Sequence, residues 1–403
     1  MAKGTSASPL SGYLVPRQLL VGAGTSAQVG EALLSQWIAP GPVLVVADRN
    51  VSIRGLMDPL LNGLVDAGFA THTFDEIEGE PDDDVVMRCV DQARLVKATV
   101  VVGIGGGSAM DVAKVVSLLA TSGGEISNWL GAVTPTVAPL TLVLIPTTTG
   151  TGSEATRIAM VTVAGAKRAV SCGDFVPAIA VLDVNLVADL PSAVVASTGM
   201  DAIAHAVESM LSKTRSDFSI SAATRAVSLL TTNLEDAVSG DIAARENVLY
   251  GAHLAGLALN AGVVLGHSLA YVVARHSSIS HGASCALALP YCLAYNGGVD
   301  ADIAMIISKA LVGEERIGLQ LVADRIAELA ERVGQPKSLE AVGIQRAEIP
   351  QMAKEVVDEY PRPNNPIDLE LGAIEKLFER MFEGNLSSCW DNLTMEGSAS
   401  RDI

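Results

Sequence analysis

The sequence predicts an α/β domain in the first half of the chain and an all-helical domain in the second half. Short apolar runs rich in β-branched residues alternate with helix-like segments up to about residue 190. Such alternation is typical of a doubly wound, mostly parallel sheet. Beyond that point the strand-like runs stop, and Ala, Leu and Glu recur with helical spacing. The length of 403 residues also exceeds one ordinary hydrophobic core, which indicates at least two domains.

Four runs in the first half predict buried parallel strands, because each is apolar and bounded by turn-forming or polar residues. They are PVLVVAD (42–48), ATVVVGI (98–104), LTLVLIP (140–146) and AIAVLD (178–183). Helix-like spacing occupies 51–68 and 82–97 between them. We therefore assign residues 1–190 to the α/β domain, 191–384 to the helical domain and 385–403 to a loose polar tail.

The composition excludes several classes of protein. A net charge of −18 opposes binding to nucleic acid or to an anionic membrane surface. The five cysteines form no CxxC pair, which argues against a disulfide scaffold or a zinc ribbon. The first residues lack the apolar core of a secretory signal, and the most apolar stretch, 98–120, carries Asp111 and Lys114. We expect a cytoplasmic protein with reduced thiols and no membrane span.

Two loops that follow predicted strands indicate a nucleotide site. GIGGGSAMDVAK (103–114) opens a helix, where glycines allow close approach of a pyrophosphate and free amides bind the anion. PTTTGTGSEAT (146–156) offers hydroxyl groups for phosphate, ribose or nicotinamide. Each loop alone is also consistent with a tight connection or a Thr-rich turn. Together, at the ends of parallel strands, they predict a nucleotide crevice.

The cofactor preference rests on Asp48, which closes the strand 42–48. A carboxylate at this position accepts hydrogen bonds from ribose hydroxyls and repels a 2′-phosphate, which favours NAD over NADP. An aspartate after a strand is also a common turn former, so NADP stays possible.

Four residues of the second half have the types and spacing of metal ligands. Asp201 and His205 lie four apart on a predicted helix and therefore share one face. His267 and His281 follow, fourteen residues apart. One carboxylate and three imidazoles suit a divalent ion such as Fe²⁺ or Zn²⁺. The Asp–His pair is equally typical of a surface pair or a satisfied core contact, and the residues alone leave both open.

These motifs, in this order, resemble the iron-containing (group III) alcohol dehydrogenase family over nearly the whole chain. They are GGGSAMDVAK (105–114), PTTTGTGSEAT (146–156), DAIAHAVES (201–209) and the block from His267 to HGASCALALPYCLAYN (281–296). The resemblance implies a Rossmann-like N-terminal domain and a helical C-terminal domain, the architecture shared with dehydroquinate synthase. It also implies NAD(P)-dependent hydride transfer between nicotinamide and an alcohol or aldehyde, a bound Fe²⁺ or Zn²⁺, and a homo-oligomer such as a dimer.

The resemblance also implies roles for individual residues. Its metal-ligand pattern falls on Asp201, His205, His267 and His281. Its cofactor positions fall on Asp48, Gly106, Gly107, Ser108, Asp111, Thr147, Thr148, Thr151 and, at the nicotinamide ribose, Lys167. The expected catalytic residues are His267 and Tyr271. Many members carry a histidine where this chain has Tyr271, so that Tyr271 or water would serve as the proton relay.

Several alternatives stay open at this point. A maleylacetate-reductase-like enzyme would use the same fold without metal, and a hydroxyacid–oxoacid transhydrogenase would keep its cofactor bound while two substrates alternate. A dehydroquinate-synthase-like lyase shares the architecture but replaces the Asp-x-x-x-His start with glutamate. Arg275 and His276 lie between the last two predicted ligands. They either face the pocket, which would favour a carboxylate-bearing substrate, or are solvated charges on a loop.

Overall fold

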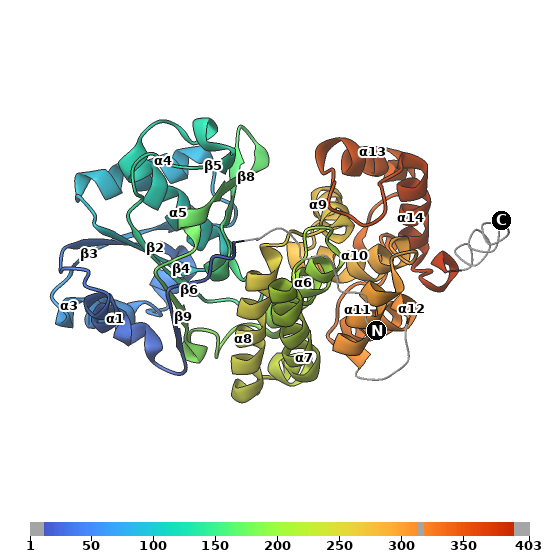
Figure 1. Ribbon diagram of the computed structural model, residues 1–403, viewed down its shortest axis with the longest axis horizontal. Helices are drawn as coiled ribbons and strands as arrows, with labels where there is room; N and C mark the ends of the chain where they lie inside the picture. The colour runs from blue at the N-terminus through green and yellow to red at the C-terminus, as the bar shows by residue number, and fades with distance from the viewer. Residues whose placement is uncertain (1–11, 313–317, 391–403) are drawn as a thin grey trace, which may run out of the picture. The chain divides into compact units, whose positions relative to one another are not determined.

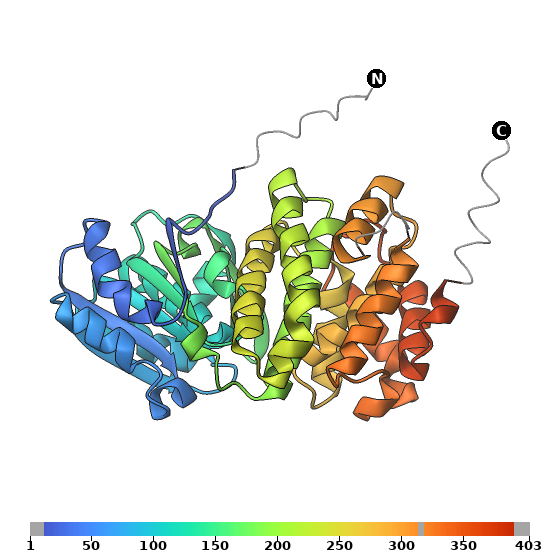
Figure 2. The same ribbon diagram turned by 90° about the horizontal axis from the view of Figure 1, so that it is seen from below.

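The computed structural model describes residues 12–312 and 318–390. The chain divides into two compact units (Figures 1 and 2). Of the described residues, the first unit comprises 12–148 together with Gly152–Asp189, and the second comprises Thr149–Thr151 and those from Leu190 to Trp390. Of the predicted polar tail 385–403, residues 391–403 lie outside the described residues.

The first unit is built on a six-stranded parallel sheet with the strand order β1-β9-β6-β4-β2-β3. The strands are β1 (Gln18–Val21), β2 (Pro42–Asp48), β3 (Ala70–Ile77), β4 (Val100–Gly105), β6 (Thr141–Pro146) and β9 (Ile179–Leu182). The four predicted strands are the four central ones, and the predicted parallel α/β class is confirmed. The two additional strands, β1 and β3, lie at the edges of the sheet, and Phe74 and Ile77 are the only residues of theirs that are buried.

Helices cover both faces of this sheet (Figure 1). On one face, α4 (Asp83–Leu95) and α5 (Gly107–Ser122) share a core with Leu44 and Val46. On the other, α1 (Val29–Ser35) and α3 (Asp58–Asp66) share a core with Val43 and Val45. Successive residues of a strand point to opposite faces, so the uninterrupted apolar run of β2 serves both cores. The short helix α2 (Arg49–Ile53) follows β2 directly.

A smaller three-stranded sheet completes the first unit. The hairpin of β7 (Ile158–Val163) and β8 (Ala166–Cys172) is antiparallel, and β5 (Gly131–Val133) pairs with β8 in parallel.

The described residues of both units also form short 3-10 helices, which are Thr25–Gln28, Ile126–Trp129, Ser153–Ala155, Gly173–Phe175, Val184–Leu186, Glu340–Val342, Arg346–Glu348 and Ser387–Cys389.

The second unit is helical, as predicted. Its helices are α6 (Ser192–Leu211), α7 (Asp217–Ser239), α8 (Ile242–Leu259), α9 (Leu265–His276), α10 (His281–Tyr295), α11 (Ala301–Val312), α12 (Leu319–Arg332), α13 (Ile349–Glu359) and α14 (Leu371–Glu383). Helix α6 is buried on nearly every side, with α7, α8 and α10 packed against it. A helix that is buried all round is normally apolar throughout. The charged residues that α6 does carry therefore require partners inside the unit.

Among the described residues, no helix is both long and apolar enough to cross a membrane. All five cysteines carry free thiols, which agrees with the absence of a disulfide framework in the sequence.

Candidate metal centre and nucleotide loops

Three polar side chains lie on one face of the buried helix α6. Asp201, His205 and Glu208 occupy positions separated by four and three residues, so they follow one another along the same face. Their exposed fractions are 5%, 6% and 0%. Burying such groups is costly unless they are paired or bind an ion. Helix α6 therefore presents a row of polar groups to a site inside the second unit.

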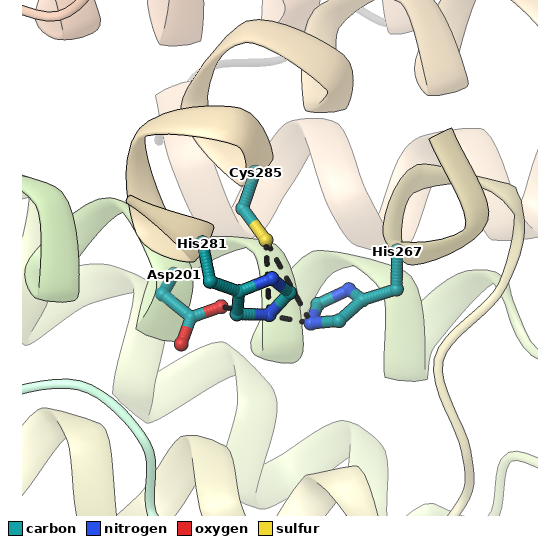
Figure 3. Close-up of side chains that lie close together, drawn as sticks. All are labelled: Asp201, His267, His281 and Cys285. Atoms are coloured by element: carbon teal, nitrogen blue, oxygen red, sulfur yellow. Dashed lines mark hydrogen bonds and ion pairs between the residues drawn. The ribbon is translucent and has the colours of Figure 1, made fainter. Parts of the chain in front are cut away.

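The next two helices bring further imidazoles to this row. His267 lies in the first turn of α9, and His281 is the first residue of α10. The Oδ1 atom of Asp201 is 3.6 Å from Nε2 of His205, 3.6 Å from Nε2 of His267 and 3.7 Å from Nε2 of His281. Figure 3 shows Asp201, His267 and His281 converging. Each of the three predicted imidazole ligands thus lies within 3.7 Å of the predicted carboxylate ligand, Asp201.

The geometry of this cluster fits a divalent ion. The Oδ1 atom of Asp201 is buried and makes no hydrogen bond. Donor atoms about 2.1 Å from one ion in a tetrahedron lie roughly 3.4 Å apart, close to the separations observed. Burial opposes ionisation of Asp201, but the surrounding imidazoles His205 and His281 lower its pKa. Burial also lowers the pKa of His205, which leaves a neutral imidazole able to act as a ligand.

Glu208 is a site residue that the sequence reasoning missed. Its Oε1 atom is 2.6 Å from Nδ1 of His267, and its Oε2 atom accepts hydrogen bonds from the backbone amides of Val264 (2.7 Å) and His267 (3.2 Å). A carboxylate at Nδ1 fixes the proton there and leaves Nε2 free to bind a metal. The sequence did contain an indication of this role, because Glu208 follows Asp201 by seven residues and so lies on the same helix face.

Two glycines set the spacing of these elements. A Cβ at Gly266, just before His267, would lie 2.6 Å from Oε1 of Glu208. A Cβ at Gly282, just after His281, would lie 2.2 Å from the backbone oxygen of Ser197 on α6. Any side chain at either position would force the helices or Glu208 apart. The absence of a side chain is therefore what lets α9 and α10 approach α6 closely enough for the donors to converge.

Cys285 was also missed. It lies one turn after His281 on α10, and its Sγ atom is 3.6 Å from Nε2 of His281 and 3.9 Å from Nε2 of His267 (Figure 3). Burial raises the pKa of the Cys285 thiol to about 12. From the sequence, it was one of five scattered cysteines with no distinguishing motif.

Tyr271 lies beside the cluster, one turn after His267 on α9. Its ring stacks on that of His281, with centroids 5.1 Å apart, and meets the ring of His267 edge-on at 6.0 Å. The Tyr360 ring lies 5.3 Å away, and the guanidinium of Arg362 lies 5.8 Å from the centre of the Tyr271 ring. Tyr271 is therefore held against two of the predicted metal ligands.

Arg275 and His276 lie at the end of α9 rather than on a loop, and both are paired with α13 and its flanks. Arg275 contacts Glu355 (3.2 Å) and Glu359 (2.9 Å), and His276 contacts Glu348 (2.9 Å) and Glu355 (3.2 Å). The carboxylates of Glu355 and Glu359 balance the positive charge of Arg275. The structure thus gives both residues a role in attaching α13 to α9.

The predicted nucleotide loops meet at the carboxyl ends of adjacent strands in the first unit. Asp48 ends β2, and its Oδ2 atom accepts a hydrogen bond of 2.6 Å from the amide of Gly106, just after β4. Thr147 follows β6 and donates its amide to Gly105 at 2.9 Å. After β2 the chain continues to β3 on one side, and after β4 it continues toward β6 on the other side. The carboxyl ends of β2 and β4 therefore form the topological switch point where ligands bind in such sheets. Burial raises the pKa of Asp48.

The other predicted cofactor residues have different surroundings. Gly106 caps α5, and Gly107 and Ser108 form its first turn. The hydroxyl of Thr148 is buried without a hydrogen-bond partner, whereas Thr151 belongs to the second unit. Lys167 lies on β8, with its Nζ atom 2.5 Å from Oε1 of Glu80.

Asp111 is engaged by the protein itself. Its Oδ1 atom accepts a 2.6 Å hydrogen bond from Ser153, and its Oδ2 atom accepts one of 2.9 Å from the amide of Met160. Fully buried Lys114 lies 3.4 Å from Asp111 and donates to Ser153, Thr156 and the backbone oxygen of Ile158. Asp111 and Lys114 thus attach α5 to the end of the second loop and to strand β7, which follows it.

Comparison with known proteins agrees with this picture. Residues 16–184 match the model of the iron-containing alcohol dehydrogenase family, and residues 195–382 match the C-terminal model of the Fe-containing alcohol dehydrogenase family. A long-chain-alcohol dehydrogenase of Geobacillus thermodenitrificans is 33% identical over 356 residues, which are 85% of this chain and 90% of that protein. An NAD-dependent methanol dehydrogenase of Bacillus methanolicus is 29% identical, covering 89% of this chain and 96% of that protein.

Solved structures give the same result. A crystal structure of a 1,3-propanediol oxidoreductase superposes with a TM-score of 0.87 and 29% identity, covering 93% of this chain and 100% of that one. The prediction of an oxidoreductase that acts on CH–OH groups is confirmed by these relatives. Two family models that together span most of the chain, and a relative of 33% identity along most of its length, lead to one conclusion: the chain belongs to the iron-containing alcohol dehydrogenase family.

Proposed function

We propose that this chain interconverts small alcohols and their aldehydes with NAD, using a divalent ion held by Asp201, His205, His267 and His281. Membership of the family implies a divalent metal and a nicotinamide cofactor. The observation that carries the ligand assignment is the buried Oδ1 atom of Asp201, which makes no hydrogen bond and lies 3.6–3.7 Å from three imidazole Nε2 atoms. Fe²⁺ is the first candidate and Zn²⁺ the second, since both accept oxygen and imidazole ligands.

The chemistry divides between the bound groups and the side chains around them. When bound, the metal supplies Lewis-acid stabilisation of a substrate oxygen, and nicotinamide carries the hydride. Glu208 orients His267 through the 2.6 Å contact at Nδ1. The Tyr271 ring stacks on that of His281 and meets that of His267 edge-on, so we propose that its phenol relays a proton between the substrate and water.

The proposed cofactor contacts follow from the edge formed by β2, β4 and β6. The amides of Gly106, Gly107 and Ser108 at the start of α5 suit a pyrophosphate. Asp48 at the end of β2 favours NAD, in line with the name of the methanol dehydrogenase relative. The remaining proposed cofactor residues are Thr147, Thr148, Thr151, Lys167 and Asp111, the last as a support for the loop rather than a direct contact.

The test combines metal content with turnover. Protein purified without oxygen is analysed for metals by mass spectrometry, and oxidation of NADH and NADPH is followed with aldehydes from one carbon to long chains. About one iron or zinc per chain, with activity lost on chelation and restored by metal, is the expected result. A metal-free protein that reduces a keto acid instead would contradict the assignment. We also propose a homo-oligomer, which light scattering measures directly.

A further inference from the structure

Cys285 faces the proposed metal site from the helix turn that follows His281. The two residues are four apart at the start of α10 and so share one face. The Sγ atom points to two imidazoles, 3.6 Å from Nε2 of His281 and 3.9 Å from Nε2 of His267. Figure 3 shows the sulfur pointing toward both rings. A thiol that served only to fill space in an apolar core would face aliphatic carbon instead.

The positions of four donor atoms match one coordination sphere. One donor atom each from Asp201, His267, His281 and Cys285 lies within 4.8 Å of all the others. A thiolate sulfur and an imidazole nitrogen bound to one tetrahedral zinc ion lie roughly 3.5 Å apart, given a Zn–S distance of about 2.3 Å. The observed sulfur–nitrogen separations are 3.6 and 3.9 Å. His205 is not part of this group, although its Nε2 atom is 3.6 Å from the same Asp201 oxygen.

A second observation points independently to a ligand at this place. The Oδ1 atom of Asp201 is buried in a side chain only 5% exposed, and it makes no hydrogen bond. An unsatisfied carboxylate oxygen in such surroundings is costly unless a cation meets it. The same oxygen therefore belongs to two overlapping sets of four donors, which share Asp201, His267 and His281. The sets differ only in the fourth donor, which is His205 in one and Cys285 in the other.

We propose that, when Zn²⁺ rather than Fe²⁺ occupies this site, Cys285 binds it directly in place of His205, together with Asp201, His267 and His281. This inference rests on the proposed function, because it concerns the same metal. Thiolate is a soft donor that selects zinc, whereas the set of three imidazoles and one carboxylate lacks sulfur and suits Fe²⁺ equally well. The bond forms between zinc and the sulfur, and the thiol proton leaves to solvent, as in other thiolate sites.

The experiment uses Co²⁺ as a spectroscopic substitute for Zn²⁺ in the metal-free full-length chain. A cobalt–thiolate bond gives an intense near-ultraviolet charge-transfer band in addition to the visible bands that any bound Co²⁺ shows. The wild-type protein is expected to show both. Cys285→Ala is expected to lose the near-ultraviolet band and keep the visible bands. Its affinity for Zn²⁺, measured by competition with a chromophoric chelator, is expected to fall on the order of tenfold or more.

Cys292 provides a matched control. It is a second buried thiol on α10, seven residues after Cys285, and the side chain of Asn296 contacts its sulfur at 3.7 Å. Cys292→Ala removes the same atoms from the same helix, and both cobalt bands and the zinc affinity are expected to stay as in the wild type. Circular dichroism on each variant checks that the helices have formed.

The outcomes separate this inference from the function on which it rests. Wild-type protein that binds Co²⁺ and shows visible bands without the charge-transfer band would overturn the role of Cys285 and leave the metal site in place. Failure of the wild type to bind Co²⁺ at all would overturn both. A Cys285→Ala variant that keeps the charge-transfer band, or a Cys292→Ala variant that loses it, would also reject the assignment.

Discussion

Glu208→Gln tests how strongly a side chain outside the proposed ligand set controls the metal. Glu208 accepts three hydrogen bonds, two backbone amides at Oε2 and the Nδ1 atom of His267 at Oε1. Glutamine can offer its single oxygen to the two amides, but its NH₂ group then faces Nδ1. That arrangement moves the imidazole proton to Nε2, the atom that faces Asp201. If the glutamine amide were flipped, its NH₂ group would face the backbone amides of Val264 and His267, which are also donors, and neither hydrogen bond could form.

The size of the effect follows from this proton shift. Loss of a carboxylate that orients a metal-bound histidine typically lowers metal affinity by about 10- to 100-fold, which corresponds to about 1.4–2.8 kcal/mol. The metal-free protein also loses a hydrogen bond to a charged group, which contributes about 1.5–3 kcal/mol to folding. We therefore expect weaker metal binding and a lower free energy of unfolding in the same variant.

The assay is a competition titration with a chromophoric chelator, followed by urea unfolding of the metal-free protein. Glu355→Gln is the matched control, because Glu355 is also buried and contacts a histidine, His276, at 3.2 Å. That variant is expected to lose folding stability without losing metal affinity. Glu208→Gln protein that binds the metal within twofold of the wild type would refute the tautomer argument.

Three further predictions concern the rest of the chain. Lys114→Met removes a buried cation beside Asp111, and we expect the free energy of unfolding to fall by about 3 kcal/mol in urea titrations; a loss well below 1 kcal/mol would show that the pair contributes little. Asp48→Asn keeps an acceptor for the amide of Gly106 but removes the negative charge. The ratio of NADPH to NADH turnover is therefore expected to rise about tenfold, roughly the effect of one unit charge at a partly screened distance from the 2′-phosphate. An unchanged ratio would show that Asp48 does not determine the choice of cofactor. Chelation is expected to abolish turnover while NADH binding, followed by nicotinamide fluorescence, persists, because the proposed pyrophosphate contacts at the start of α5 lie in the first unit and none of the proposed metal ligands does; simultaneous loss of both would show that NADH binding depends on the metal.

The sequence predicted the central part of the sheet because burial on both faces demands uninterrupted apolar runs, as in β2 and β4. It did not predict β3 because an edge strand is partly solvated, and ATHTFDEI carries five polar or charged side chains among its eight residues. The small sheet of β5, β7 and β8 was missed for a related reason. Its strands are short or interrupted by charged residues such as Lys167 and Arg168, which resemble loop composition.

For the site, residue type carried most of the prediction. Histidines are rare in this chain, so His205, His267 and His281 were visible as candidates before any contact was known. Cys285 was not, because a thiol is informative only once its neighbours are known, and those neighbours include His267 on another helix. Glu208 could have been found because it lies seven residues after Asp201, on the same face of the helix. Its hydrogen bond to His267, however, joins residues 59 positions apart and depends on how α6 and α9 pack.

The two glycines beside the proposed ligands have a consequence for how the site tolerates substitution. Because Gly266 and Gly282 carry no side chain, α9 and α10 come close to α6, and this packing sets the spacing of the proposed donor atoms. A larger residue at either position would shift donor atoms without removing any of them. The two glycines are therefore as much a requirement of the proposed site as the residues that would bind the ion.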